Sequence, residues 1–521
     1  AGGIFSASER GLLKEQGIDL LRIPEQQALF EKYYVYFALT QASEQLWLTY
    51  PQKNTAGAGL APSSAVAQVE KILERPPVSS CQQDPLERAC NVTTAFDLMA
   101  QSWQELSQRQ AVLRNWFSEH SCEKLDSLIA ASQGRTFRIQ EPRLARRLFG
   151  EELRLSPSRV ERYYNCPFSY FCESGLKLRA RRRVEFDPIA SGSLIHLVLE
   201  QMVRKYGGRG LAFRKDSELR EEVAAMVQEH LSAKIQDFDG MPERFKYLFR
   251  RLVNTLVRLL KRLASEFVQS LFEPEAFEMP IRMDAQVKPL DLRTPDGTRV
   301  IVEGVVDRVD VYQRGEKRYV RVVDYKSGRK GFNLSDVCFG LNMQMLIYLF
   351  SICSDQEKGN AQSIPAGVLY LPARDQIVSV ERNTPAEAVM TEQAKLLRMN
   401  GLLLEDRESL SAMEPNLAGV FIPVRSKKDG GYTSSSPLAT LAQMGTIQRK
   451  IEQNLRDLAN FLHEGRVEAT PVDGLKDYTP CQWCDYHNIC AHEDGDPVRR
   501  LGSFDLEAAL ELLKKEEETD V

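Results

Sequence analysis

Apolar and polar residues alternate most regularly between residues 300 and 328. This stretch, VIVEGVVDRVDVYQRGEKRYVRVVDYKSG, reads as two strands rich in Val, Ile and Tyr that meet at a turn in residues 314–317. A two-residue loop that begins with Gly315 suits a type II′ hairpin. If the residues that flank this loop face each other, the register places Asp307 opposite Asp324 and puts Lys326 on the same face.

Helical periods and short apolar runs predict further elements on both sides of the hairpin. The longest helical stretch carries an apolar stripe of six residues, Phe245, Leu248, Leu252, Leu256, Leu259 and Leu263. The chain therefore reads as an α/β protein. The predicted helices cover 24–42, 64–75, 94–118, 122–132, 192–206, most of 211–270, 334–353 and 437–464, and the further strands cover 45–51, 366–373 and 418–424.

The acids of the hairpin suggest a chemistry. Two opposed carboxylates lie only about 5 Å apart at Cβ and repel each other, so a bridging cation would stabilise the pair. Asp324 interrupts the apolar run of its strand, and Lys326 follows two residues later. Carboxylates that hold a hard divalent ion beside an ammonium group suit phosphodiester cleavage. The simpler interpretation is a hairpin with charged residues on its solvent-exposed face.

Several motifs resemble one known family. GVVDRVD followed by VVDYKSG resembles the PD-(D/E)XK nucleases of the RecB type, GLNMQMLIYLF resembles their Gln-x-x-x-Tyr helix, and GSLIHLVLE resembles their histidine-bearing helix. SPSRVERYYNCPFSYF and CQWCDYHNIC narrow the resemblance to the AddB subunits of AddAB helicase–nucleases. The resemblance is strong over residues 151–495 and weaker over the first 150. Val306, rather than proline, precedes Asp307, as in many members of the RecB-type group.

The resemblance implies a restriction-endonuclease-like mixed sheet flanked by helices, preceded by a smaller helix-rich α/β region of the helicase type. It also implies roles for individual residues. Lys326 would orient the attacking water, while Gln344 and Tyr348 would lie beside the active site and orient DNA and catalytic groups. The expected Mg²⁺ ligands are His196, Asp307, Asp324 and the main-chain carbonyl of Tyr325.

The last cysteines of the chain form the pattern Cys481-x-x-Cys484-x5-Cys490, and Cys166 lies far upstream. This spacing fits an iron–sulphur cluster, a zinc site or a redox dithiol. In a zinc site His487 or His492 would replace a cysteine, and Cys172 competes with Cys166 as the upstream ligand. The AddB resemblance implies a [4Fe–4S] cluster held by Cys166, Cys481, Cys484 and Cys490 at the two ends of the nuclease domain.

Two basic segments are candidate DNA contacts. GLKLRARRRVEF includes Arg181 and Arg183, and the helix before the hairpin carries Arg250 and Arg258 with few acids between them. Such arginines neutralise backbone phosphates and can line a channel for a single strand. A solvated charged surface is the simpler explanation of both segments.

Composition sets limits on these expectations. The chain has 521 residues, 43% hydrophobic and 27% charged residues and a net charge of −4, so DNA would have to bind at local basic patches. No apolar run reaches the roughly 18 residues that span a bilayer, and no signal peptide is visible. The chain has ten cysteines, three of which lie close together near its end, and this usage favours a reducing, cytoplasmic setting. The first residue is not methionine, which indicates a fragment or a processed product. The expected division is residues 1–150, 151–495 and an acidic tail, 496–521, that is loose or binds a partner.

The AddB resemblance implies a Mg²⁺-dependent DNA exonuclease subunit that forms a heterodimer with an AddA-type helicase–nuclease and cuts the 5′-ended strand, and we expect no membrane partner. The chain contains no Gly-Lys dipeptide and therefore no P-loop motif of its own. An alternative is a catalytically inert DNA-binding scaffold with a structural metal cluster. A third hypothesis is an RNA- or protein-binding module with a zinc site.

Overall fold

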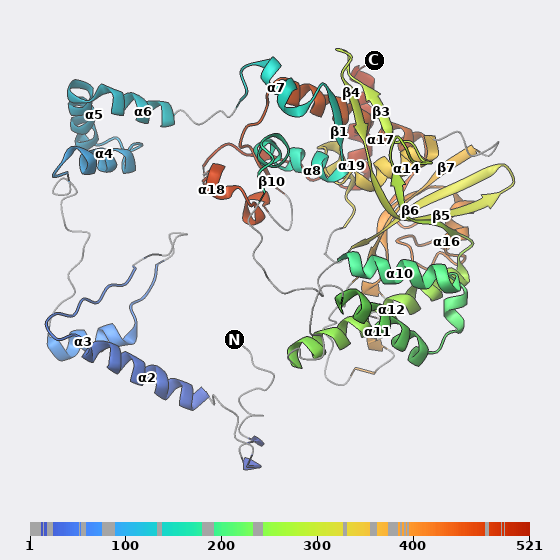
Figure 1. The fold of residues 1–521 in the computed structure, drawn as a ribbon, viewed down its shortest axis with the longest axis horizontal. Helices are drawn as coiled ribbons and strands as arrows, with labels where there is room; N and C mark the ends of the chain where they lie inside the picture. Colours follow the sequence, from blue (N-terminus) through green and yellow to red (C-terminus); the bar gives the residue numbers. More distant parts are fainter. Residues whose placement is uncertain are drawn as a thin grey trace. The chain divides into compact units, whose positions relative to one another are not determined.

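The computed structural model in Figure 1 divides the chain into two compact units, Ala1–Gln133 and Gly134–Val521. The division precedes the boundary that we expected near residue 150. The structure describes residues 12–13, 15–17, 24–51, 53, 59–74, 89–132, 138–179, 192–232, 243–326, 331–354, 362–373, 384–385, 388–389, 392, 395–474, 479–490, 492–493 and 495–520.

The first unit is helical. Leu98 and Met99 of α4 pack with Leu113 and Phe117 of α5 in a small buried cluster. Residues 45–51, all of which are described, form no strand, so the predicted strand there is wrong. The helices of this unit are α2 (Pro24–Thr40), α3 (Ser64–Leu73), α4 (Val92–Gln101), α5 (Gln108–His120) and α6 (Cys122–Ser132).

The second unit is built around a mixed six-stranded sheet in the order β2-β5-β6-β7-β8-β9. The central pairs β2–β5 and β5–β6 are antiparallel, and β7 joins β6 in parallel, as expected for a strand that returns through a helix. The predicted hairpin and the predicted strand at 366–373 are therefore confirmed. The strands are β2 (Glu273–Ile281), β5 (Gly304–Arg314), β6 (Lys317–Lys326), β7 (Gln362–Pro372), β8 (Asn400–Leu404) and β9 (Leu438–Ala439).

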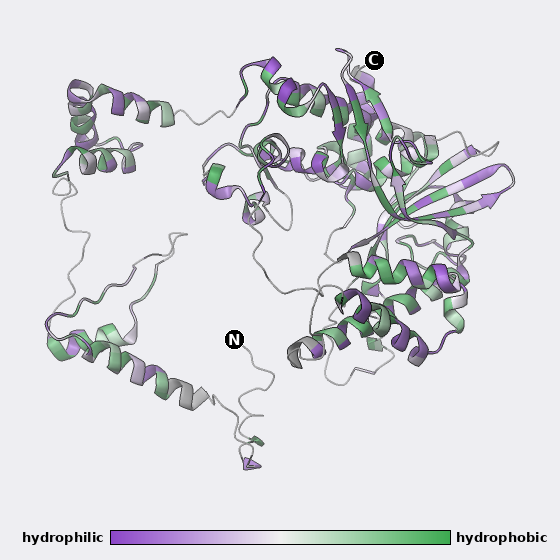
Figure 2. Cartoon of the chain, in the orientation of Figure 1, coloured by the Kyte–Doolittle hydropathy of each residue, from purple (hydrophilic) through white to green (hydrophobic). Residues whose placement is uncertain are grey.

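Helices pack against this sheet and bury their apolar residues. Four members of the predicted stripe on α12 are confirmed: Leu252, Leu256, Leu259 and Leu263 are buried while Arg250 and Arg258 are exposed. Leu248 is only half-buried, and the side chain of Phe245 lies outside the described part. Figure 2 shows this mixture of hydrophobic and hydrophilic residues along α12. α14 packs against β6 and β7, and α10 contacts β6. These helices are α10 (Gly192–Tyr206), α11 (Asp216–Ser232), α12 (Glu243–Gln269), α14 (Gln344–Ser354) and α17 (Leu441–His463).

The beginning and the end of the second unit are joined by contacts between residues far apart in sequence. The small sheet β1-β4-β3 pairs β1 with β4 in parallel. The Tyr163 hydroxyl donates to the Arg466 carbonyl at 3.1 Å, and the Tyr164 hydroxyl donates to the Asn454 carbonyl at 2.6 Å. The elements involved are α7 (Pro142–Phe149), β1 (Glu152–Leu155), α8 (Pro157–Asn165), α9 (Pro167–Tyr170), a π-helix (Phe171–Gly175), β3 (Leu290–Arg293), β4 (Arg299–Val302), β10 (Val472–Asp473), α18 (His487–Cys490) and β11 (Arg499–Arg500).

Besides residues 45–51, the predicted helix 94–118 is divided into α4 and α5, and three segments of the second unit also differ from expectation. The predicted helix 334–353 is divided into α13 (Leu334–Cys338) and α14, because Gly340 and Asn342 adopt positive φ values of +82° and +56°. Residues 418–424 form no strand, because the Glu414 carboxylate accepts hydrogen bonds from the N–H groups of residues 420–422. Much of the segment expected as a loose tail forms α19 (Leu506–Asp520), whose Ala509 and Leu513 are buried. None of the helices in the described ranges is long and apolar enough to cross a membrane.

Candidate active site

The two strands of the hairpin bring the predicted acids together. β5 and β6 pair antiparallel up to Arg308 opposite Val323. Gly315 has a φ of +58°, as the first loop residue of a type II′ turn requires. One further step of the same register places Asp307 opposite Asp324, at the end of the hairpin away from the turn.

Lys326 lies next to Asp324. Its Nζ atom is 2.7 Å from Asp324 Oδ2. Asp324 is only 5% exposed, and a buried carboxylate is costly unless positive charge compensates it. The Lys326 ammonium supplies such charge at Oδ2. A carboxylate has further lone pairs on its two oxygens, so Asp324 could also share an oxygen with a metal ion.

Asp307 is surrounded by the other predicted metal ligands. Its Oδ2 accepts a hydrogen bond from the Tyr325 main-chain N–H at 3.0 Å. His196 of α10 places Nδ1 3.6 Å from Asp307 Oδ1 and Nε2 3.2 Å from the Tyr325 carbonyl oxygen. If Nε2 carries the proton and donates it to this carbonyl, Nδ1 presents a lone pair toward the carboxylates, as a metal-binding histidine does.

Glu278 of β2 is a further acid at this site, and the sequence analysis missed it. Its Oε1 lies 3.4 Å from His196 Nδ1, and donor atoms of His196, Glu278 and Asp307 lie within 4.8 Å of one another. Glu278 has a φ of +46° within its strand, a strained conformation that clusters at functional sites. A register shift between Pro274 and Ala276 changes which side chains of β2 share a face, and the sequence shows no sign of that shift.

The electrostatics of the site favour a bound cation. Burial, together with the charges of Asp324 and Glu278, raises the pKa of Asp307 to about 6, while His196 and the Tyr325 N–H act in the opposite direction. The carboxylates of Asp307 and Glu278 and the imidazole of His196 offer donor atoms within 4.8 Å of one another, and these donor types can hold a divalent ion such as Mg²⁺. The residues present therefore fit the predicted metal.

The predicted residues of α14 lie beside the strand that carries Asp307. The Tyr348 hydroxyl accepts a hydrogen bond from the Val305 N–H and is also hydrogen-bonded to the Gln344 side chain. Burial raises the pKa of Tyr348 to about 12, and Asp307 is one of the charges that contribute. A Cβ atom at Gly304 would overlap with the Tyr348 hydroxyl, so only glycine allows this approach.

The comparison with known families settles the class of this domain. Residues 154–491 match the model of the PD-(D/E)XK nuclease superfamily. The chain belongs to this superfamily. Its matched region includes all the residues described above, so the mixed sheet and hairpin acids are those of a PD-(D/E)XK domain.

Curated relatives of this PD-(D/E)XK protein are named as the B subunits of ATP-dependent helicase/deoxyribonucleases. Those from Thermoanaerobacter sp. (strain X514) and Clostridium tetani (strain Massachusetts / E88) are each 28% identical over 99% of this chain and 47% of their own length. The relative from Clostridium kluyveri (strain NBRC 12016) is 29% identical over 94% of this chain and 44% of its own length. The chain thus spans about half the length of these relatives.

A second candidate site joins the two ends of the PD-(D/E)XK domain. Cys166, Cys481, Cys484 and Cys490 line one cavity of about 330 Å³. Burial raises the pKa of Cys166 to about 11, so without a metal this thiol stays protonated. Four cysteines around one cavity are a donor set that fits a [4Fe–4S] cluster or a zinc ion.

The alternatives at this second site remain distinct. His487 and His492 also line the cavity, and His492 Nε2 is buried without a hydrogen-bond partner among the described residues, so zinc stays open on geometry alone. Cys172 is fully buried and packs with Phe168 and Tyr486 rather than lining the cavity. Among the two upstream candidates, the geometry favours Cys166.

Only some of the predicted DNA contacts fall within the described ranges. Arg181 and Arg183 lie outside the described residues. Arg250 and Arg258 are exposed on α12 and line a shallow surface pocket with Tyr247, a side chain on which a base could stack. Their role in DNA binding stays a prediction.

Proposed function

We propose that the PD-(D/E)XK domain is a Mg²⁺-dependent deoxyribonuclease that hydrolyses phosphodiester bonds of single-stranded DNA. The observation that carries this proposal is that Asp307 lies with His196 and Glu278 at the open end of one hairpin, with the Asp324–Lys326 pair on the neighbouring strand. An inert nuclease fold would be expected to lack an acid or the lysine, and here all these groups are present.

Each residue has a defined part in this mechanism. Asp307, Asp324 and His196 would hold Mg²⁺, which supplies neutralisation of the scissile phosphate and acidification of a water molecule. The Tyr325 carbonyl, predicted as a further ligand, lies against His196 Nε2 and would orient the imidazole. The Lys326 ammonium, positioned by Asp324, orients the attacking water and stabilises negative charge that develops in the transition state. Gln344 and Tyr348 lie beside the strand of Asp307 and orient the DNA and these groups.

The proposal extends to the assembly in which the domain works. The names of the relatives, B subunits of ATP-dependent helicase/deoxyribonucleases, support a partner subunit and helicase activity in the assembly. We therefore propose a heterodimer with an AddA-type helicase–nuclease, a role in recombinational repair of double-strand breaks, and cutting of the 5′-ended strand. Substrates labelled at the 5′ or the 3′ end of one strand, supplied with the partner motor, would test the polarity. Preferential loss of the 3′-ended strand would contradict it.

We further propose that the cysteine cavity holds a [4Fe–4S] cluster. The cluster would bond Cys166 to Cys481, Cys484 and Cys490 and so join the two ends of the domain. Iron and acid-labile sulphide assays on protein purified without oxygen would test this assignment. If the purified protein contained zinc but no iron or sulphide, the cavity would be assigned as a zinc site and the cluster proposal would be wrong.

A nuclease assay with matched variants tests the catalytic proposal. Asp324→Ala removes a ligand and the partner of Lys326, so cleavage of single-stranded DNA in Mg²⁺ should fall about 100-fold or more while DNA binding persists. Asp291→Ala is the control, because Asp291 belongs to an ion pair with Arg299 on β3 and β4. If Asp324→Ala cleaves as fast as the wild type, or if the wild type binds DNA without cleaving it, the inert scaffold is the better account.

A further inference from the structure

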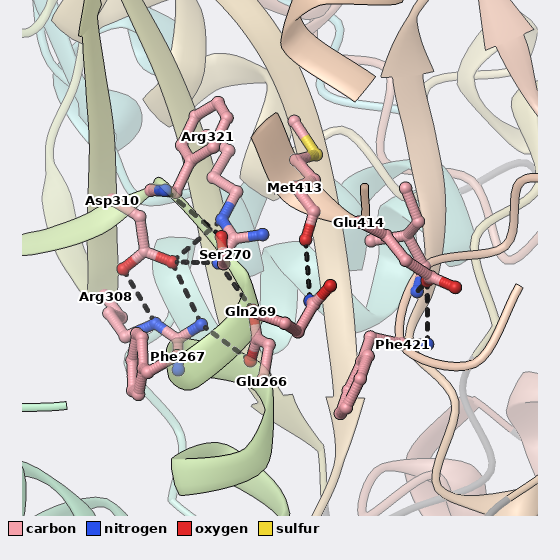
Figure 3. Close-up of polar contacts among 12 residues, drawn as sticks. Glu266, Phe267, Gln269, Ser270, Arg308, Asp310, Arg321, Met413, Glu414 and Phe421 are labelled. Atoms are coloured by element: carbon pink, nitrogen blue, oxygen red, sulfur yellow. Dashed lines mark hydrogen bonds and ion pairs between the residues drawn. The ribbon is translucent and has the colours of Figure 1, made fainter. Parts of the chain in front are cut away.

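A network of four buried charges lies on the face of the hairpin opposite the acids. Asp310 of β5 pairs directly with Arg321 of β6 across the two strands. Arg308, Asp310, Arg321 and Glu266 of α12 are each no more than 1% exposed. Figure 3 shows their side chains converging between the hairpin and α12. Because residues alternate along a strand, Arg308 points away from the face that carries Asp307.

The contacts within the network are close. Asp310 Oδ2 accepts hydrogen bonds from Arg308 Nη2 at 3.0 Å and Arg321 Nε at 2.9 Å. Glu266 is ion-paired with Arg321 and lies 3.6 Å from Arg308 Nη2. Two arginines and two acids therefore balance their charges in a water-excluded space between α12 and the hairpin.

This network reaches the metal site through Tyr325. Arg308 Nη1 donates a hydrogen bond to the Tyr325 hydroxyl at 3.2 Å, and Tyr325 is only 4% exposed. The main-chain N–H and carbonyl of the same residue contact Asp307 and His196 at 3.0 and 3.2 Å. Tyr325 is thus held by its side chain on one face of the hairpin and contacts two proposed metal ligands through its backbone.

Stability alone is a poor explanation for such a network. Replacing buried ion pairs with apolar side chains of similar size is often neutral or stabilising, because burial of charge is costly. Arg321 Nη1 is moreover buried without a hydrogen-bond partner among the described residues, which adds to this cost. The four charges hold the Arg308 side chain in one orientation and so fix the direction of its hydrogen bond to Tyr325, which apolar side chains could not do.

We propose that the network formed by Arg308, Asp310, Arg321 and Glu266 is a positioning device, which holds Tyr325 so that its backbone keeps Asp307 and His196 in the geometry that binds the metal. This inference rests on the proposed nuclease function. It assigns to α12 a second task, since Glu266 fixes the two arginines from that helix. Gln269 and Ser270, at the end of α12, bond to the carbonyls of Met413 and Ala412 and anchor the helix in turn.

Metal binding by full-length variants tests the proposal without relying on activity. Arg308→Met keeps the side-chain volume and removes the network, so the Mn²⁺ dissociation constant from calorimetry should rise about tenfold, the scale seen when partners of metal ligands are removed. Tyr325→Phe deletes only the hydroxyl that accepts from Arg308 and should raise the same constant a few-fold. Arg308→Lys should restore part of the affinity, because an ammonium can still meet Asp310.

Arg318→Met is the matched control. Arg318 is 6% exposed on β6, pairs with Glu275 at 2.9 Å and donates to Ser363 at 3.1 Å. It does not contact Tyr325, so its replacement should lower thermal stability as Arg308→Met does while Mn²⁺ affinity stays at the wild-type value. Cleavage should show the same separation: Arg308→Met needs more Mg²⁺ for half-maximal rate, and saturating Mg²⁺ restores most of the rate.

The outcomes separate this inference from the nuclease proposal. If Arg308→Met and Tyr325→Phe bind Mn²⁺ as tightly as Arg318→Met, the positioning role is wrong and the network is structural. If Arg308→Met does not fold, the Mn²⁺ affinity of Tyr325→Phe tests the positioning role by itself, because that variant keeps the aromatic ring and both backbone groups of residue 325. If wild-type protein binds Mn²⁺ no better than Asp324→Ala, the metal site itself is wrong and the nuclease proposal fails first.

Discussion

The Asp307 carboxyl lies between groups with opposite effects on its charge. Burial and the neighbouring acids Asp324 and Glu278 disfavour its ionised form, while His196 and the Tyr325 N–H favour it. The resulting pKa of about 6 means that a proton and a metal ion compete for the same oxygen near neutral pH. Metal binding at this residue should therefore depend on pH.

Acidification should weaken metal binding at the nuclease site. Below pH 6 each further unit of acidity should lower Mn²⁺ affinity about tenfold, because one proton is displaced on binding. Without a bound metal, the folding stability should change with pH in the opposite direction from the metal affinity. The pKa of Asp307 in the folded protein lies above its value of 3.8 in the unfolded chain, so the stability that Asp307 contributes is lost as the pH rises from about 4 to 6. Calorimetry across pH 4.5–8 measures the Mn²⁺ affinity, and melting curves over the same range measure the stability of the metal-free protein. A flat affinity profile would contradict the raised pKa.

The close approach of Tyr348 to Gly304 leads to a second prediction at the level of single residues. Gly304→Ala should push the Tyr348 ring away from the Val305 N–H, and cleavage in saturating Mg²⁺ should fall about tenfold or more because the catalytic groups are misplaced. Gly210→Ala is the control, since a Cβ there makes only an ordinary contact with Tyr206. Equal rates for both variants would show that the approach of Tyr348 does not matter.

At the level of elements, the sequence pattern predicted those helices and strands whose structure depends mainly on residues close together in the chain. The hairpin register follows from a two-residue turn and strict alternation, so Asp307, Asp324 and Lys326 could be placed together from sequence. Glu278 could not, because it reaches the site through a non-local pairing with a register shift. The break between α13 and α14 was also hidden, since the positive φ of Asn342 lies within an apolar run that looks like one helix.

The packing of α19 shows the same limit. Its acidic composition suggested a loose tail, yet Ala509 and Leu513 are buried, Lys450 lies 2.8 Å from Glu516, and Arg449 lies 2.6 Å from Glu517. The spacing of apolar residues in this segment shows that one face of the helix is apolar, but it does not show against which surface that face packs. That surface, α17 and α13, is made of residues far away in the chain.

A single buried leucine tests whether α19 is docked in solution. Leu513→Ala removes a side chain that is 2% exposed and should destabilise the docked helix by about 2–3 kcal/mol, which hydrogen exchange of the α19 amides would show as faster opening. Lys514→Ala is the control, because the Lys514 side chain is 76% exposed. Fast exchange of α19 in the unmodified protein would mean that the helix is not stably docked.

At the scale of the whole molecule, the cysteine cavity determines how firmly the nuclease domain is closed. Cys166 precedes the six-stranded sheet, and Cys481, Cys484 and Cys490 follow it, so a metal at this site would close a very long loop. Such closure restricts the unfolded chain more than the folded one. The expected stabilisation therefore does not depend on contacts with the active site.

Removing one cysteine should reveal that closure. Cys484→Ala should abolish the visible absorption of the proposed cluster and lower the melting temperature of the domain, because the two ends are no longer bonded. Cys353→Ala on α14 is the control, as this cysteine lies away from the cavity. Normal colour and stability in Cys484→Ala would contradict the assignment of this ligand.

The contacts between the beginning and the end of the nuclease domain also determine when the domain can complete its folding during translation. A ribosome delivers Tyr163 and Tyr164 long before it has made their acceptors at Arg466 and Asn454. During that interval the two hydroxyls lack their native acceptors, and the surface of α8 that α17 later covers is exposed to chaperones or to aggregation. Translation must pass residue 466 before this half of the nuclease can close, so pauses upstream of that point prolong the vulnerable state.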